Sequence, residues 1–278
     1  MVSTVSRIID PRPATPSLQG IYIRTLGSGV EVVGSDLDIV IKAKSSADVE
    51  IEGEALINSR VLTDIVRKLP KGDIVFSDIG SELRVEQNKL NFTLRKLDEK
   101  TYPEALLKEN YENEKSLEID PIELFESLKK VGIAASPEGG RPILTGVYFN
   151  NENEKTELAA TDSYRLATHD ITSFPIKDAG ILSFRSLNET AKIFEQTNDK
   201  ISINSTEREL HFYDSKFSAS IRKLEGNFPE YRNLFPKETL FSIEVNKNTI
   251  LEALDRATVV AEGFIPVKLE VVDSGTLK

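Results

Sequence analysis

Three aspartates offer the best chance of acid–base or metal chemistry in this chain. Asp36 and Asp38 stand two residues apart after a strand-like run, and Asp162 follows a similar run further along. Paired carboxylates can hold a metal ion, or act as a general acid and a general base. A hydrolase that uses these three side chains is therefore one hypothesis. The competing interpretation is that Asp36 and Asp162 cap turns at strand ends, because aspartate readily bonds to the backbone two residues on.

The other residues that could do chemistry are few. The two histidines, His169 and His211, stand about forty residues apart and lack the spacing of metal ligands. His211 lies in an alternating run, and we expect it at the surface. The segment 27–29 sits between two predicted strands, so a hairpin turn is favoured over a phosphate-binding loop. These patterns offer few groups for catalysis, and we expect no cofactor and no metal.

The chain repeats itself with a period of about 126 residues. The matching segments are Pro16–Tyr22 with Pro142–Tyr148, Gly34–Asp36 with Ala160–Asp162, Arg95–Leu97 with Arg222–Leu224, Tyr102–Glu104 with Phe228–Glu230, and Arg60 with Arg185. Matches in the same order at nearly one offset indicate a duplicated module. Glu118–Asp120 opens the second copy, and the same offset predicts a third copy that opens at Glu244–Asn246.

The repeat predicts three domains. We expect a first domain at residues 1–114, a complete second domain at 115–240 and the start of a third at 241–278. The first domain is expected to lack its opening helix, because only Met1–Thr15 precede the first matching segment. The third is expected to be truncated at Lys278.

The patterning predicts an α+β fold, in which each complete copy packs two helices on antiparallel sheets of about eight short strands. Apolar residues at helical spacing predict helices at 59–69, 121–133 and 186–196, and a fourth after Asn246. Alternating or apolar runs predict strands at 74–77, 143–150, 157–161, 201–205, 209–213 and 217–223.

Composition narrows the class of protein. Cysteine is absent, which excludes disulfides and thiolate metal sites. No apolar run of about 18 residues and no secretory signal occurs, so we expect a cytoplasmic protein without a membrane anchor. The net charge of −10 argues against an ordinary nucleic-acid binder. Nucleic-acid binding requires the positive charge to be gathered on one surface.

Lysines and arginines on the predicted helices are candidates for such a surface. They are Arg60, Arg67, Lys68, Lys129, Lys130, Arg185 and Lys192, with Lys247 and Arg256 on the fourth helix, and Arg12 in an extended loop nearby. Acidic residues on the same helices bring their summed charge close to neutral, against a strongly acidic whole. Two interpretations stay open: a surface that faces nucleic acid, and ordinary solvated helix faces.

Two motifs connect the repeat to a known family. The runs Thr161–Ala167 and Phe228–Arg232, together with the threefold repeat, resemble the β subunit of bacterial DNA polymerase III, the sliding-clamp family. The resemblance implies the DNA-clamp fold and a homodimer that closes head to tail into a ring around double-stranded DNA. The helical cations and Arg12 would contact phosphates without reading sequence. The implied function is a non-catalytic processivity factor of the polymerase holoenzyme. A repetitive β-rich adaptor that never meets DNA is the alternative.

The resemblance also implies two protein interfaces. DNA polymerase and clamp-loader subunits would dock short peptides in an apolar groove formed by Leu144, Thr161, Ser163, Tyr164, Arg165, Leu166, Pro229, Asn233 and Leu234. Asn233 departs from the family pattern, in which a basic residue is common. The ring interface would pair Phe92 and Leu94 of one chain with Val259 and Val260 of the other.

Overall fold

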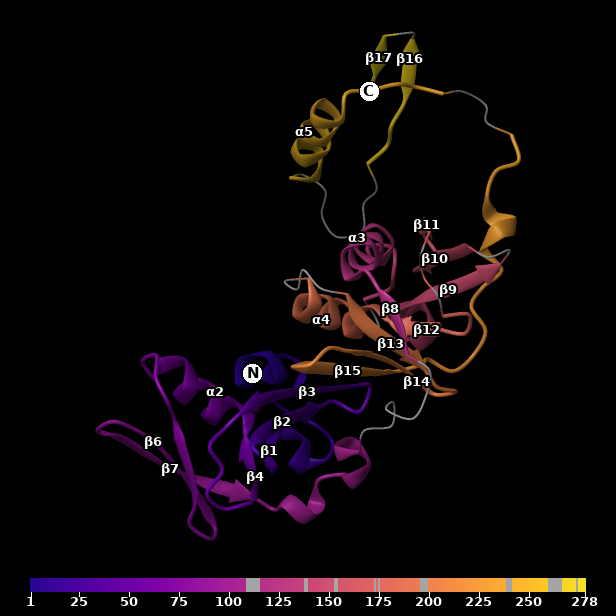
Figure 1. Ribbon diagram of the computed structural model, residues 1–278. Helices are drawn as coiled ribbons and strands as arrows, with labels where there is room; N and C mark the ends of the chain where they lie inside the picture. Colours follow the sequence, from indigo (N-terminus) through magenta and orange to yellow (C-terminus); the bar gives the residue numbers. More distant parts are fainter. Residues whose placement is uncertain are drawn as a thin grey trace. The chain divides into compact units, whose positions relative to one another are not determined.

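The computed structural model describes residues 1–108, 116–137, 140–152, 155–172, 174, 176–195, 200–238, 242–259, 267–273 and 275–278. They form two compact units, Met1–Pro229 and Glu230–Lys278. The larger unit runs from indigo to orange in Figure 1 and contains the first two copies of the repeat.

The first copy combines short helices with seven strands. Its elements are α1 (Val2–Val5), η1 (Ser6–Ile8), η2 (Pro16–Gln19), β1 (Gly20–Leu26), β2 (Gly29–Ser35), β3 (Ile39–Ser46), β4 (Glu54–Asn58), α2 (Ser59–Lys68), β5 (Val75–Asp78), β6 (Glu82–Gln87), β7 (Leu90–Leu97), η3 (Glu99–Thr101) and η4 (Glu104–Leu107).

The second copy has two full helices and eight strands. Its elements are β8 (Leu117–Ile119), α3 (Pro121–Gly132), η5 (Pro142–Thr145), β9 (Gly146–Glu152), β10 (Lys155–Thr161), β11 (Leu166–Ile171), β12 (Gly180–Ser183), α4 (Phe184–Phe194), β13 (Ile201–Ser205), β14 (Glu209–Tyr213) and β15 (Phe217–Arg222). The smaller unit contains η6 (Tyr231–Leu234), α5 (Lys247–Thr258), β16 (Val271–Asp273) and β17 (Thr276–Leu277).

The repeat extends to the caps of the helices. Asn58 caps α2 by accepting from the Val61 N–H, and Ser183 caps α4 in the same way. The Asp120 carboxylate caps α3, and Asn246 caps α5 at the equivalent place in the third copy. A capping side chain satisfies N–H groups that the first turn of a helix leaves unbonded. Equivalent residues therefore start α2 and α4, and likewise α3 and α5.

One antiparallel sheet joins the first two copies. It has eleven strands in the order β5-β6-β7-β4-β1-β2-β3-β15-β14-β13-β8. The copies meet where β3 pairs with β15, with Ala43 opposite Phe217 and Ile39 opposite Ile221. A second sheet has the order β11-β10-β9-β12, and β16 pairs with β17 in the smaller unit. The α+β prediction with repeated domains is confirmed.

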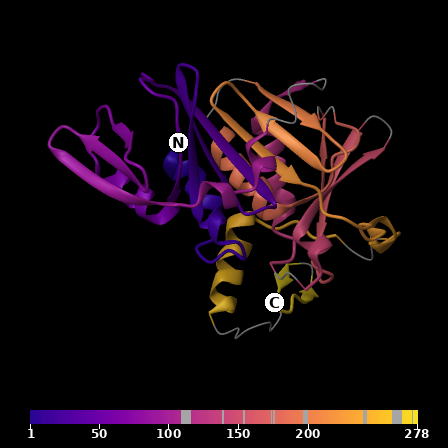
Figure 2. The ribbon, with the colours of Figure 1, turned by 90° about the horizontal axis from the view of Figure 1, so that it is seen from below.

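The helices α1, α2 and α4 pack on one face of the eleven-stranded sheet, whereas α3 lies mainly against α4 and the four-stranded sheet, with Phe125 reaching Phe212 of β14. Ile21 and Ile41 point to this face and share one core cluster with Leu62 of α2 and Phe194 of α4. Tyr22 points the other way and packs against Tyr102 in a separate cluster, under the segment that holds η3 and η4. Alternation along a strand separates the two faces. Figure 2 shows α3 and α4 lying against strands of the second copy, and both also contact the four-stranded sheet.

The N-terminal segment departs from the sequence prediction. Met1–Thr15 were expected to provide no helix, yet Val2–Val5 form α1 and Ser6–Ile8 continue as η1. Val5 and Ile8 are fully buried in the main core. The segment is too short to show helical periodicity in the sequence, and burial of these two side chains stabilises it instead.

Most predicted elements exist, with shifted ends. The helix expected at 186–196 is α4 at 184–194, because Ser183 caps it two residues earlier. The strand expected from residue 143 begins at Gly146, since Pro142–Thr145 form a short 3-10 helix. The strands predicted at 201–205, 209–213 and 217–223 are β13, β14 and β15 almost to the residue.

Candidate functional site

The aspartates predicted as turn caps hold two equivalent turns. Asp36 Oδ1 accepts from the backbone N–H groups of Asp38 and Ile39, at 3.1 and 3.0 Å. Asp162 Oδ1 accepts from those of Tyr164 and Arg165, both at 2.9 Å. Among the described residues, no group of three His, Cys, Asp or Glu side chains is placed to hold a metal ion. The turn interpretation therefore accounts for Asp36 and Asp162.

The two turns share a strained backbone. Leu37 and Ser163, one residue after each aspartate, both have a φ of 77°. This conformation costs a non-glycine residue on the order of 1–3 kcal/mol, so the surrounding hydrogen bonds must hold it. The Thr161 hydroxyl donates to Arg165 O at 2.7 Å and accepts from the Ser163 N–H. Ser35 does the same in the first copy.

The two aspartates differ in their electrostatics. Burial raises the pKa of the Asp36 carboxyl, and the backbone hydrogen bonds and nearby Arg185 do not outweigh it. Burial also raises that of Asp162, but backbone hydrogen bonds and the Arg165 guanidinium outweigh the burial, so its pKa lies below the usual value. The difference follows from depth, because the Asp162 turn reaches further into solvent.

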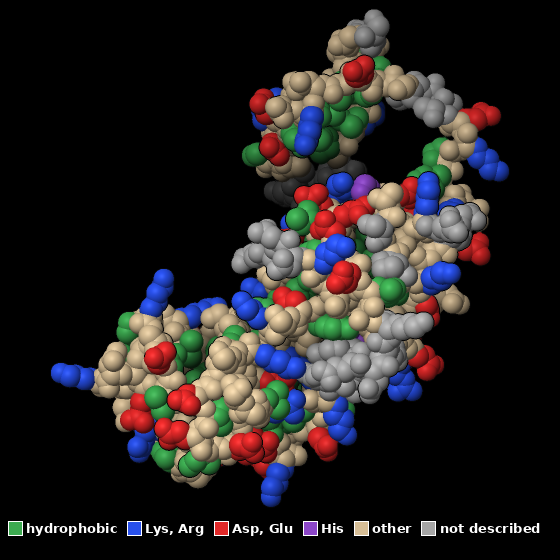
Figure 3. All heavy atoms as spheres, in the orientation of Figure 1, with side chains coloured by type: hydrophobic (Ala, Val, Ile, Leu, Met, Phe, Trp, Pro, Cys, Tyr) green, Lys and Arg blue, Asp and Glu red, His purple; other side chains and the backbone are tan. Residues whose placement is uncertain are grey.

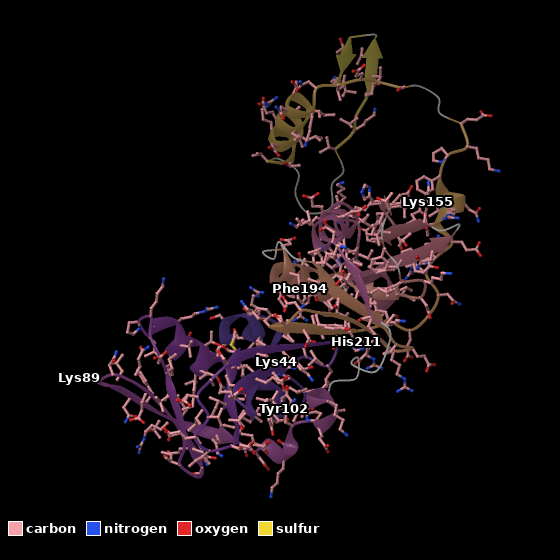
Figure 4. All side chains as sticks on the ribbon, in the orientation of Figure 1. Lys44, Lys89, Tyr102, Lys155, Phe194 and His211 are labelled. Atoms are coloured by element: carbon pink, nitrogen blue, oxygen red, sulfur yellow. The ribbon has the colours of Figure 1, made fainter. Side chains whose placement is uncertain are left out.

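His211 is not at the surface, so that expectation was wrong. It is 1% exposed on β14, and its Nδ1 lies 2.8 Å from Ser220 Oγ of the neighbouring strand. Burial, followed by the charges of Lys42 and Lys223, lowers the pKa of the imidazole to about 4. Figure 4 labels His211 on the large sheet, away from the helices. The alternation was correct, but a period of two residues does not tell which face of a strand is buried.

The predicted cations of the first copy are exposed. Arg60, Arg67 and Lys68 project from α2, and Arg12 lies in the loop before η2. The Arg67 guanidinium donates to the Ser3 hydroxyl at 3.3 Å. Within the part of the chain that the structure describes, none of these four side chains forms an ion pair. Their charges are therefore available to an anionic ligand.

The predicted cations of the second copy are exposed too, but most have acidic partners. Lys129 of α3 lies 2.7 Å from Glu195, and Arg185 of α4 lies 3.2 Å from Asp36. Lys192 pairs with Glu189 one turn away on α4. Lys130 Nζ instead lies 3.3 Å from the ring nitrogen of His169. Figure 3 shows Lys and Arg side chains scattered among acidic ones over the face in view, so no continuous basic stretch appears there.

Sequence reasoning missed one cation on the same side of the sheet. Arg7 lies in η1, and its Nε is 3.3 Å from Glu189 Oε2. It was overlooked because the N-terminal segment was not expected to be helical. No sequence signal marks it, because the segment is too short to show helical periodicity.

Five of the predicted peptide-groove residues, Thr161 and Ser163–Leu166, belong to the Asp162 turn and the strand ends beside it. Tyr164 is 98% exposed, and Ser163 and Arg165 are exposed beside it. Arg165 Nε donates to Asp162 Oδ2 at 2.9 Å. Leu166 is half-buried opposite Thr161, and Pro229 is exposed.

Two of these residues lie deeper than a contact residue requires. Leu144 is 5% exposed in η5, and Thr161 is 5% exposed with its hydroxyl bonded inside the turn. Neither side chain offers much surface to a ligand. The two predicted residues of the smaller unit, Asn233 and Leu234, lie in η6 and are exposed there.

The second copy also has an open hollow that the sequence did not predict. Its volume is about 690 Å³, and Tyr148 and Phe228 line it with their rings stacked 5.2 Å apart. Arg208, Arg222 and Lys223 contribute cations to its rim.

The predicted ring-interface residues are unequal in exposure. Phe92 is half-buried on β7, whereas Leu94 is 7% exposed and belongs to the core of its own chain. Val259 follows α5 in the smaller unit and is 82% exposed. Val260 lies outside the described residues. No helix in the described ranges is long and apolar enough to cross a membrane.

Comparisons with known proteins agree along most of the chain. Residues 1–107 match the family model for the N-terminal domain of the DNA polymerase III beta subunit, and residues 118–230 match that for its central domain. The beta sliding clamp of Bacillus subtilis is 30% identical over 273 residues, which cover 94% of this chain and 71% of that protein.

Solved structures match the fold equally well. The crystal structure of the DNA polymerase sliding clamp from Bacillus subtilis has a TM-score of 0.86 at 28% identity, covering 95% of this chain and 72% of that one. The DNA polymerase III beta chain from Streptococcus pneumoniae has a TM-score of 0.88 at 25% identity, covering 98% of this chain and 75% of that one.

Proposed function

This chain belongs to the DNA polymerase III beta-subunit family, and we propose how its own residues carry out the work of a sliding clamp. The protein is a DNA sliding clamp, a non-catalytic processivity subunit of the replicative polymerase holoenzyme. The adaptor alternative is not favoured by these matches. We propose in addition which residues contact DNA, the partner peptide and the second subunit.

We place duplex DNA against the helical face of the eleven-stranded sheet. The observation that carries this is the set of exposed cations on α2, Arg60, Arg67 and Lys68, which form no ion pair within the described residues. Lysine and arginine contacts to phosphate give affinity without sequence readout, as a protein that moves along DNA needs. Arg12 adds a further exposed charge in the first copy.

We place the partner peptide on the surface around the Asp162 turn. Tyr164 and Leu166 provide apolar area, and Arg165 provides a fixed donor because its Nε is held by Asp162. A few placed polar groups beside an apolar surface can orient a short peptide. Leu144 and Thr161 would shape this surface from below. The other two predicted contacts, Asn233 and Leu234, lie in η6 of the smaller unit.

We further propose the domain limits 1–114, 115–240 and 241–278, and a homodimeric ring. Phe92 and Val259 are the exposed or half-exposed members of the proposed interface, with Leu94 supporting Phe92 and with Val260 beside Val259 in sequence. A cytoplasmic location is inferred from the bacterial chromosome that a replication clamp serves.

The DNA placement predicts the salt dependence of binding. Arg60→Ala, Arg67→Ala and Lys68→Ala together should weaken binding to a short labelled duplex and flatten the plot of log affinity against log salt. The steepness of this plot should fall by about 0.9 for each phosphate that the variant no longer neutralises. Fluorescence anisotropy between about 50 and 200 mM salt measures this.

Lys89→Ala is the matched control. Lys89 is an exposed lysine at the tip of the β6–β7 hairpin, away from the helices in Figure 4. It should leave the slope unchanged. Equal effects of the triple variant and the control would contradict the placement of DNA on the helical face.

A further inference from the structure

Glu189 sits between two cations of the helical face. Its side chain is 15% exposed; Oε1 accepts from Lys192 Nζ, and Oε2 lies 3.3 Å from Arg7 Nε. Lys192 belongs to the same helix, α4, whereas Arg7 comes from η1 of the first copy. One carboxylate therefore neutralises cations from both copies of the module.

A second pair has the same arrangement. The Asp36 carboxylate, 9% exposed, lies 3.2 Å from the Arg185 guanidinium, which is 66% exposed. Here the acid comes from the first copy and the cation from α4. Arg185 is the repeat counterpart of Arg60, and Arg60 forms no ion pair within the described residues. Equivalent positions on α2 and α4 thus differ in whether a carboxylate holds the charge.

Such pairing changes how a surface attracts a phosphate. At separations of 3–4 Å the charges of a pair largely cancel beyond a Debye length of about 8–10 Å. A cation that is already paired neutralises little phosphate charge, so few of the counterions condensed on the DNA are released when it approaches. Paired cations therefore add little to affinity or to its salt dependence.

We propose that Glu189 and Asp36 limit the affinity of this clamp for DNA by holding Arg7, Lys192 and Arg185 in intramolecular ion pairs. The affinity for duplex DNA then depends mainly on the cations of α2, and α4 faces the duplex as a nearly neutral surface. This inference rests on the proposed placement of DNA on the helical face. Weak phosphate binding on one copy and firmer binding on the other suits a protein that must hold a duplex and still move along it.

The test measures duplex binding of the 278-residue chain across salt concentrations. Glu189→Gln should increase affinity at low salt and steepen the salt dependence by about 0.9 for each additional phosphate that the protein neutralises. Each such phosphate corresponds to a further three- to fourfold fall in affinity between about 50 and 200 mM salt. Asp36→Asn should give a smaller change in the same direction, because it releases only Arg185. The turn should stay intact in this variant, since the amide oxygen can still accept the turn hydrogen bonds.

Glu225→Gln is the matched control. It removes one negative charge and frees Arg222 from an ion pair at 3.8 Å, but it lies after β15 and not on the helices. It should leave the salt dependence unchanged. Equal steepening by Glu189→Gln and Glu225→Gln would show a general effect of net charge and overturn the inference, as would no change with either Glu189→Gln or Asp36→Asn.

The triple variant of α2 separates the two proposals. A flatter slope in that variant, with no change in Glu189→Gln and Asp36→Asn, contradicts the inference and leaves the DNA placement standing. If the triple variant also leaves binding unchanged, the helical face is not the DNA surface and both proposals fail. Circular dichroism of each variant confirms that the folded chain is being compared.

Discussion

Single residues of the helical face act through the partners that folding brings to them. Arg185 and Lys192 were predicted as DNA contacts from their helix positions, and both are exposed as expected. Their pairing with Asp36 and Glu189 was not predictable, because helical periodicity identifies an exposed position but not an acid from a distant segment. At this scale the sequence located the cations and could not assign their partners.

His211 gives a prediction of stability at the same scale. Its pKa of about 4 in the folded chain lies below the ordinary value of about 6.5, so between these values the unfolded chain binds more protons. The stability that His211 contributes is complete above about pH 6.5 and falls as the pH drops toward 4. The loss is at most about 3 kcal/mol.

Urea unfolding of wild type and His211→Gln at several pH values measures this contribution. The variant should lose part of the slope of unfolding free energy between pH 4 and 6.5 that the wild type shows. His169→Gln is the control, because His169 is half-exposed on β11. If both variants changed the slope equally, burial of His211 would not be its cause.

At the scale of elements, the turns after β2 and β10 show how one local design serves different roles. Both depend on an aspartate, the hydroxyl of the residue before it and a residue with φ of 77°. In the first copy the aspartate also holds Arg185, whereas in the second the turn presents Tyr164 and Arg165 to solvent. The sequence predicted both turns, since the short-range chemistry of aspartate is visible in the residues themselves.

The Asp162 turn should be required for partner binding. Asp162→Ala removes the acceptor for two backbone N–H groups and the anchor of Arg165, a loss of about 1 kcal/mol in the turn. Affinity for a short polymerase-derived peptide should fall about fivefold or more, as measured by calorimetry. Asp162→Asn should lose less, because its amide oxygen can still accept.

Asp36→Ala is the control from the equivalent turn of the first copy. It removes the same backbone hydrogen bonds, at 3.1 and 3.0 Å, without touching the proposed peptide surface. Peptide affinity should stay at the wild-type value in this variant. Equal losses in the two alanine variants would mean that the second turn has no special part in docking.

Element boundaries were predictable where the alternation of apolar and polar residues was strong. The strands β13, β14 and β15 alternate clearly and were placed almost to the residue, whereas α4 starts at a serine cap that the apolar pattern alone does not reveal. The helix α1 escaped prediction because its stability comes from tertiary packing of Val5, and not from its own sequence.

At the scale of the whole molecule, the architecture was predictable mainly from the sequence repeat. Equivalent caps and strands about 126 residues apart indicate one module used more than once. What the sequence could not give is the junction, where β3 pairs with β15 and one sheet runs through both copies. Strand pairing between modules depends on long-range register, which no local pattern encodes. This junction places α1 and α2 of the first copy on the same face of one sheet as α4 of the second.

Topological binding tests the account most directly. The protein is loaded by a clamp loader onto a nicked circular plasmid, the complex is separated from free protein by gel filtration, and half of it is then cut once with a restriction enzyme. A clamp that holds DNA by encircling it should stay with the intact circles and leave the linear product by sliding off its ends. Equal retention on circular and linear DNA would contradict the account.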